Sequence, residues 1–202
     1  MNRLRLINAI SEAIIPLLGI FFFEWGIYFI LLFYFIDLVA TEVFLYIKVN
    51  KIIQFQKINF PFQTRYGRLL MNTFLMLCVI LIAHIAVFYI VPEIDFFAQI
   101  HAFIHYEEAG IPIPQGYILL PFVILGNFQQ YKTMFIKTGQ YQRSSWKTLI
   151  FSRRNALYVS LIGGGLAIVL AQFITIPEFV YVLIVVAVKF YIDLYHTKNS
   201  AV

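Results

Sequence analysis

Residues 27–47 form an apolar stretch, IYFILLFYFIDLVATEVFLYI, that contains only two charged side chains, Asp37 and Glu42. A helix of about 20 residues crosses the hydrocarbon core of a bilayer, which is about 30 Å thick. The stretch therefore predicts a membrane-spanning helix. The two acids inside it are the first candidates for function.

The composition of the whole chain extends this prediction. Of 202 residues, 61% are hydrophobic, 18% are aromatic and only 12% are charged. A soluble domain has about 45–50% apolar and about 25% charged residues. A soluble fold could not hide so many Phe, Ile and Leu side chains, because its surface needs polar groups. We therefore predict an all-α integral membrane protein that forms one domain over residues 1–202.

Six apolar stretches are long enough to cross the bilayer as helices. We predict membrane-spanning helices at about residues 6–23, 27–47, 69–91, 117–136, 156–176 and 179–195. The first two are joined by a tight turn that contains Trp25, a residue type typical of the membrane interface. Pro92 and Pro177 follow the third and fifth stretches, where a helix loses a backbone donor and ends.

The basic residues predict the orientation. With the N-terminus in the cytoplasm, all 15 Lys and Arg residues fall in or beside the inner segments 1–5, 48–68, 137–155 and the C-terminal tail. The outer segments contain no Lys or Arg, and they carry Glu24, Glu93, Asp95, Glu107, Glu108 and Glu178. Cytoplasmic loops are enriched in Lys and Arg, so we expect a bundle of six transmembrane helices with both termini cytoplasmic. The net charge of +5 indicates contact with anionic lipid of the bilayer rather than with nucleic acid.

Four acids fall inside the predicted helices, namely Glu12, Asp37, Glu42 and Asp193. A charge near the bilayer centre costs about 2.5–3.5 kcal/mol on the most lenient scale, so such groups face the bundle interior and find partners. Lys189 and Asp193 are spaced i, i+4 and share a helix face, which His196 extends. We predict a polar cluster in the cytoplasmic half of the bundle, made of Glu12, Glu42, Lys189, Asp193 and His196, with Asp37 above it.

Asp37 lies nearest the middle of the membrane, and no base is expected at its depth. It is therefore expected to be protonated, because burial disfavours the charged form, or to be solvated by a water-filled cavity. Either state would suit a path for protons or cations. The alternatives are a neutral carboxyl group that only joins helices, and a cluster in which Lys189 neutralises Asp193 while the Glu side chains bond neighbouring helices.

A second group of polar residues, HAFIHYEE, occupies positions 101–108 in the second outer segment. On a helix, His101, His105 and Glu108 share one face, a spacing compatible with a zinc or transition-metal site. An interfacial helix with a polar face would show the same pattern. His84 lies in the outer half of the third stretch, and we expect it to hydrogen-bond a neighbouring helix rather than to bind a metal.

Two further patterns predict helix packing. The three glycines at 163–165, with Ser160 and Ala167, form a small-residue surface that another helix can approach closely. Asn127 lies with two glutamines in one turn of the fourth stretch, and we expect its amide to form hydrogen bonds between helices.

Both ends of the chain carry distinctive segments. The first part contains Pro16-Leu-Leu-Gly19, Phe21-Phe-Phe-Glu-Trp25 and Tyr34-Phe-Ile-Asp37, and the last part contains Lys189-Phe-Tyr-Ile-Asp193-Leu-Tyr-His196. In these segments alone, the chain resembles a family of uncharacterised bacterial polytopic integral membrane proteins, a domain of unknown function. It departs from the family pattern at Asp37, where the family usually has Glu. The resemblance implies a multi-pass protein of the bacterial inner membrane and implies no particular activity.

Three functions stay open on the sequence. The first is movement of protons or small cations through the acidic cluster, with Asp37, Glu42 and Asp193 as carriers and Lys189 as counter-charge. Because a chain of this length shows no inverted repeat, we expect such a transporter to form a homo-oligomer. The second is a non-catalytic subunit or assembly factor of a membrane complex, in which the same charges fix the packing of helices.

The third function is a membrane redox protein or enzyme. It would use His84, His101 and His105 to hold a metal or haem. No nucleophile–base pair stands out in the sequence, which favours the two non-enzymatic functions. The identity of any cofactor does not follow from these residues.

Overall fold

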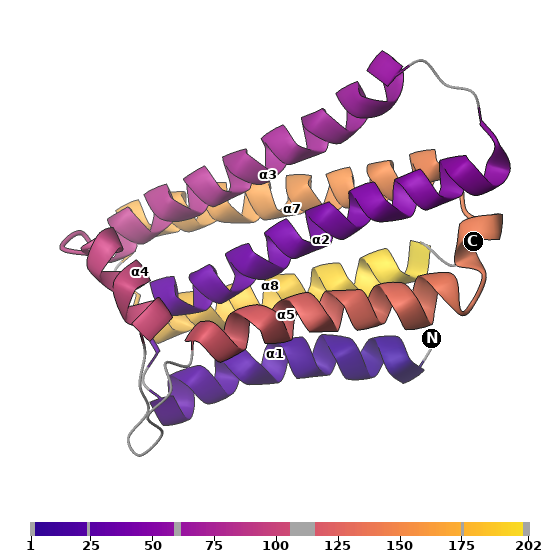
Figure 1. Cartoon of the computed structure of the whole chain (residues 1–202). Helices are drawn as coiled ribbons and strands as arrows, with labels where there is room; N and C mark the ends of the chain where they lie inside the picture. Colours follow the sequence, from indigo (N-terminus) through magenta and orange to yellow (C-terminus); the bar gives the residue numbers. More distant parts are fainter. Residues whose placement is uncertain (1–2, 24, 59–61, 106–115, 175, 200–202) are drawn as a thin grey trace.

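The structure, a computed structural model, describes the backbone of residues 3–23, 25–58, 62–105, 116–174 and 176–199 (Figure 1). The side chains at 3–9, 11–12, 62–65, 116, 118 and 193–199 are outside the described set. Every regular element in the described ranges is a helix. The prediction of an all-helical chain is therefore confirmed for this part of the protein.

The helices coincide with the apolar stretches but several extend beyond them. In chain order they are α1 (Arg3–Phe23), α2 (Ile27–Gln56), α3 (Phe62–Ile90), α4 (Phe96–His105), α5 (Gly116–Gln130), the π-helical segment η1 (Tyr131–Ile136), α6 (Gln140–Arg143), α7 (Trp146–Phe173) and α8 (Glu178–Asn199). The predicted inner segments 48–68 and 137–155 are thus largely helical. Hydropathy predicts only the part of a helix that lies in lipid. The helix itself, with its backbone hydrogen bonds, can continue beyond that part.

Three helical segments of the described chain are long and apolar enough to cross a membrane: Ile27–Gln56, Tyr66–Ile90 and Trp146–Phe173. A fourth apolar segment, Ala13–Phe23, is shorter. The fold class is therefore that of an all-helical protein with membrane-spanning helices. The count of six spans and the side on which the termini lie stay predictions.

The long helices run side by side, with α2 among the others (Figure 1). α3 and α7 pack along each other, α1 packs on α8, and α2 contacts α3, α5, α7 and α8. Residues on all sides of α2 are apolar, and a helix that is apolar all round is surrounded by protein or lipid. Its position places Asp37 and Glu42 inside the bundle.

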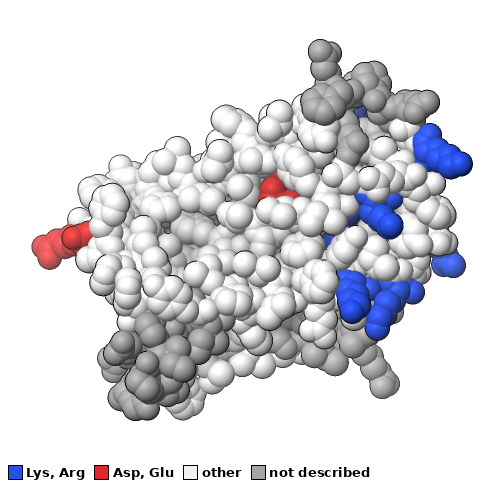
Figure 2. Space-filling view, viewed as in Figure 1, with Lys and Arg blue, Asp and Glu red and all other residues white. Residues whose placement is uncertain are grey.

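The two ends of the bundle differ in charge. α1 begins and α8 ends at the same end of the molecule (Figure 1). On the face shown in Figure 2, the Lys and Arg side chains gather at this end, which we call the basic end. Acidic side chains of the same face lie at the opposite end and near the middle. The charge segregation expected from the sequence is therefore visible on this face.

The apolar core has two main parts along α2. One surrounds the first turns of α2 and includes Tyr28, Phe29, Val87, Phe103 and Val182. The other lies toward the basic end and includes Val49, Ile52, Leu69, Phe135, Trp146 and Ile150. Asp37 and Glu42 lie on α2 between these two regions. The polar residues of α2 therefore form a layer between two apolar ones.

The turn between α1 and α2 is packed around Trp25. Its side chain is buried, with the indole ring against Gly19 and Phe29, and its place at the membrane interface stays a prediction. A Cβ atom at Gly19 would lie 2.1 Å from the indole, so only glycine fits there. The backbone N–H of Trp25 also donates to the Gly19 carbonyl over 3.0 Å. Trp25 thus joins α1 to α2.

Candidate functional site

Asp37 forms an ion pair inside the bundle. Its Oδ2 lies 3.2 Å from Nζ of Lys189 on α8. The Asn127 amide on α5 donates to Oδ1 of Asp37 over 2.9 Å, and the Thr41 hydroxyl donates to the Asn127 carbonyl oxygen over 3.2 Å. The Asp37 and Lys189 side chains keep 13% and 22% of their surface exposed. We call Asp37, Lys189 and Asn127 the aspartate site.

The aspartate site corrects one sequence expectation. No base was expected at the depth of Asp37, and Lys189 was expected to neutralise Asp193 instead. The structure brings Lys189 to Asp37 because α2, α5 and α8 begin at the same end of the bundle (Figure 1). Asp37, Asn127 and Lys189 each lie ten residues after the predicted start of their stretch, at 27, 117 and 179. Equal distance from a common end puts the three side chains at one level.

The position of Asp37 along α2 can be compared with the thickness of a bilayer. Ten residues of helix rise about 15 Å, which is half of a hydrocarbon core of about 30 Å. The ammonium group of Lys189 also lies 5.9 Å from the centre of the Tyr34 ring, within cation–π range. The site therefore combines a carboxylate, an ammonium, an amide and an aromatic face.

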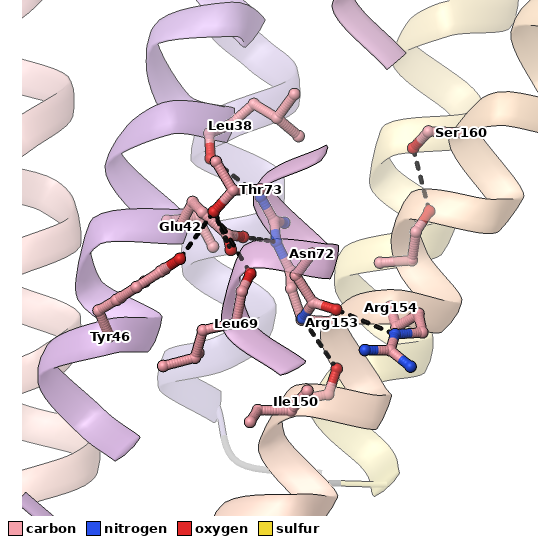
Figure 3. A network of polar contacts seen from close by, with 12 residues as sticks. Leu38, Glu42, Tyr46, Leu69, Asn72, Thr73, Ile150, Arg153, Arg154 and Ser160 are labelled. Carbon is pink, nitrogen blue, oxygen red and sulfur yellow. Dashed lines mark hydrogen bonds and ion pairs between the residues drawn. The ribbon is translucent and has the colours of Figure 1, made fainter. Parts of the chain in front are cut away.

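Glu42 forms a second ion pair, which faces α3 and α7 (Figure 3). Its Oε2 lies 3.3 Å from Nε of Arg153, and Nη2 of Arg153 donates to the Leu38 carbonyl over 2.9 Å. The Thr73 hydroxyl lies 3.5 Å from Oε1 of Glu42 and 2.9 Å from the Tyr46 hydroxyl. Only 5% of the Glu42 side chain is exposed. We call Glu42, Arg153 and Thr73 the glutamate site.

The sequence analysis missed Arg153. It placed this residue in the inner segment 137–155, whereas the structure places it in α7, about two turns after Trp146. Arg153 has a long apolar stem and a donor-rich head, so a helix can carry it below the interface when an acid is present. The sequence did contain one signal for this pairing. Glu42 is close to the inner end of its own stretch, where an arginine of an adjacent inner segment can reach it.

A third polar contact lies beside the glutamate site. The fully buried Asn72 of α3 donates from Nδ2 to the Ile150 carbonyl over 3.1 Å. Nε of Arg154 donates to Oδ1 of Asn72 over 3.0 Å (Figure 3). Nη2 of Arg154 donates to the Arg68 carbonyl over 3.3 Å. Two successive arginines of α7 thus diverge, because Arg153 bonds α2 and Arg154 bonds α3.

The predicted acidic cluster is only partly described. Asp37 and Glu42 are not brought into one site, since they face different helices. The side chains of Glu12, Asp193 and His196 lie outside the described residues, so their place in a cluster stays a prediction. Lys189 belongs to the aspartate site.

The histidines behave in two ways. Nδ1 of His84 lies 2.7 Å from the Ile80 carbonyl, which can only accept, so Nε2 accepts from the Tyr28 hydroxyl at 2.9 Å. Both ring nitrogens are thus used, and the expected role of His84 in joining helices is confirmed. His101 and His105 are exposed on α4 with their rings stacked 4.1 Å apart.

The predicted metal site stays incomplete. Nδ1 of His105 donates to the His101 carbonyl over 3.1 Å, leaving Nε2 on the exposed side. Glu108 lies outside the described residues. Among those described, no group of three or more His, Cys, Asp or Glu side chains could hold a metal ion. A metal or haem role for these histidines therefore stays a prediction.

Chemically, the two described acids of α2 are each paired with a cation of another helix. Each carboxylate of α2 has one cationic partner and at least one neutral hydrogen-bond donor. The Glu42 and Arg153 side chains keep 5% and 14% of their surface exposed, against 13% and 22% for Asp37 and Lys189.

Comparison with known proteins adds no relative: no family model, no curated protein and no solved structure matches the chain. The resemblance of the two ends to a bacterial membrane family therefore stays a prediction. Function has to be argued from the two ion pairs.

Proposed function

We propose that the chain is a six-span membrane protein of a bacterial inner membrane, with the basic end in the cytoplasm. Three helices already match membrane spans. α1 has 21 residues and α8 has 22, so each is about 30 Å long at a rise of about 1.5 Å per residue. α5 and η1 together run without a break from 116 to 136. These lengths support three further spans.

We further propose that the protein moves protons or small cations through the aspartate site. The observation that carries this proposal is the pair of Asp37 and Lys189, 3.2 Å apart, about a third of the way along α2 and halfway along α8, with both side chains partly exposed. A charge at this depth is too costly to face hydrocarbon. The exposed part of the pair is therefore expected to meet water or another protein surface.

The pair offers a simple exchange mechanism. The Asp37 carboxylate holds the Lys189 ammonium, and the Asn127 amide orients the carboxylate. A proton or small cation that binds Asp37 takes the place of the ammonium and weakens its attachment to α2. Lys189 returns when the ion leaves, so that each transfer alternates between two arrangements of α2 and α8.

The second candidate is a non-catalytic subunit or assembly factor, and the glutamate site favours it. Glu42 is nearly closed off and is bonded to Arg153 and Thr73. A pair enclosed in this way fixes how α2, α3 and α7 pack rather than exchanging ions. In such a protein the exposed part of the aspartate site would face a partner protein or a second copy of the chain.

Flux measurements separate the two candidates. The purified protein is reconstituted in liposomes that contain a pH-sensitive dye, and a pH or cation gradient is imposed. We expect wild-type protein to dissipate the gradient and the double variant Asp37→Asn/Lys189→Met to lose flux. The double variant removes both charges together, so no unpaired charge is left in the bundle.

The control is Val39→Thr, a nearly isosteric change at an exposed position of the same helix. It should keep wild-type flux. Absence of flux in the wild type, or equal flux in the wild type and the double variant, would exclude the aspartate site as the path. Co-purification of a second membrane protein at fixed stoichiometry would then favour the subunit role.

A further inference from the structure

We propose that Arg68 and Arg154 bind the phosphate of an anionic phospholipid where α3 meets α7 at the basic end. The proposal rests on how the two arginines are held, not on the aspartate site. It names a ligand that the function proposed above does not require. The two ideas can therefore fail separately.

Arg154 is held by buried protein groups. Asn72 has no exposed surface, and its carbonyl oxygen accepts from Nε of Arg154 over 3.0 Å. Nη2 of the same guanidinium bonds the Arg68 carbonyl. A guanidinium has five N–H donors, so these two bonds leave three of them for another acceptor. The side chain is thus oriented in advance, which lowers the entropy lost when a ligand binds.

Arg68 brings a second cation to the same place. Its guanidinium carbon lies 5.5 Å from the Trp146 ring centre and 6.0 Å from the Phe151 ring centre. The guanidinium carbon of Arg154 lies 5.5 Å from the same Phe151 ring. Two cations therefore lie near one aromatic ring, and an anion bound to both would reduce the repulsion between them.

No carboxylate supplies that anion among the described residues. The acids that form ion pairs inside the bundle, Glu42 and Asp37, are paired with Arg153 and Lys189 and not with Arg68 or Arg154. Both arginines lie near the first turns of their helices at the basic end, where Lys147 adds a third cation close to Trp146. Phe151 is half-exposed beside them and would contact acyl chains.

These features fit a lipid phosphate better than a free one. Arginine binds phosphate oxygens through two N–H groups at once. The half-exposed Phe151 beside the two guanidinium groups would contact acyl chains, which a free phosphate ion does not have. Basic pockets between spanning helices on the cytoplasmic side are suited to anionic head groups.

Lipid retention tests the proposal. The protein is placed in nanodiscs made of equal amounts of phosphatidylglycerol and phosphatidylcholine, extracted mildly, and weighed by native mass spectrometry. We expect wild-type protein to retain phosphatidylglycerol preferentially. Arg68→Gln should reduce that preference about fivefold, since each cation near the surface contributes about that factor. Arg154→Gln should reduce it as well.

The two variants separate loss of lipid binding from loss of folding. Arg154→Gln disturbs the buried Asn72, whereas Arg68→Gln leaves the Arg68 backbone carbonyl in place, so the contact with Arg154 survives. The matched control is Lys137→Gln, the same loss of charge at an exposed position of the basic end, which should keep the preference. Equal retention of both lipids by the wild type, or an unchanged preference in Arg68→Gln, would overturn the proposal. The proposal would also be overturned if inorganic phosphate, added at the same concentration as the lipid, displaced the bound phosphatidylglycerol from the protein.

Discussion

Single residues of α2 show how one helix carries two acids into the membrane. Asp37 and Glu42 are five positions apart, so they point to different neighbours. Asp37 meets α8 and α5, and Glu42 meets α3 and α7. Each has its own cation, which is the condition for keeping a charge in a medium of low dielectric constant.

The glutamate site makes a prediction about stability. Glu42→Gln leaves the Arg153 guanidinium without its counter-charge in a buried position, which costs about 3–5 kcal/mol. We therefore expect a lower free energy of unfolding, measured by reversible denaturation in mixed micelles. The double variant Glu42→Gln/Arg153→Gln should recover most of the loss, because it leaves no isolated charge.

Val43→Thr is the matched control for that measurement, since Val43 is half-exposed on the next position of α2. It should stay near the wild-type value. If Glu42→Gln and the double variant lose the same free energy, the ion pair does not hold α2 to α7.

At the scale of the elements, the close packing of α3 and α7 depends on one glycine. A Cβ atom at Gly164 would lie 2.6 Å from Cγ2 of Ile82 on α3, whereas a Cβ atom at Gly165 would meet nothing within 4 Å. The three glycines were predicted as a small-residue surface for a neighbouring helix. The structure confirms that role for Gly164.

Alanine substitutions at Gly164 and Gly165 should change the stability of the protein in opposite directions. Gly164→Ala forces α3 and α7 apart, and overpacking of this kind costs about 1–3 kcal/mol. Gly165→Ala adds a methyl group in open space and gains up to about 1 kcal/mol of helix propensity. Thermal unfolding in detergent should therefore show a lower melting temperature for the first and an unchanged or higher one for the second. Equal effects would contradict the close contact.

Helix ends also belong to this scale. α2 continues to Gln56 and α7 begins at Trp146. The apolar stretches predicted from hydropathy are shorter, since the second ends at 47 and the fifth begins at 156. The extensions are stabilised by packing rather than by lipid, since Ile52 and Ile53 of α2 lie in one buried cluster with Trp146 and Ile150. Hydropathy could not predict this, because it carries no information on neighbouring helices.

For the whole molecule, the charge asymmetry predicts the orientation in the membrane. The chain has one cysteine, Cys78, so a Cys78→Ala background permits single labelling sites. We expect Glu93→Cys, at the acidic end, to react with a membrane-impermeant maleimide in intact cells. Lys137→Cys, at the basic end, should react only after the membrane is opened.

Labelling of both positions from outside, or of neither, would contradict six spans with a cytoplasmic basic end. Reaction of Lys137→Cys alone in intact cells would invert the orientation. Neither result would alter the geometry of the aspartate site, because the two measurements depend on different residues.

The sequence by itself determined that this is an all-helical chain with membrane-spanning segments, and it located the acids that matter most. These properties are local, since length, hydropathy and periodicity are read along one helix. It even contained the common depth of Asp37, Asn127 and Lys189, as equal distances from three predicted helix starts. The resemblance of the first and last segments to a bacterial membrane family did not predict any contact between helices.

Only the tertiary structure decided which base meets which acid. Lys189 is spaced to share a helix face with Asp193, yet it forms an ion pair with Asp37. Arg153 was predicted in an inner loop, yet it lies in α7 and forms an ion pair with Glu42. Pairing across helices depends on which helices are neighbours and how each is rotated. Both follow from side-chain packing over the whole bundle, which no single stretch of sequence encodes.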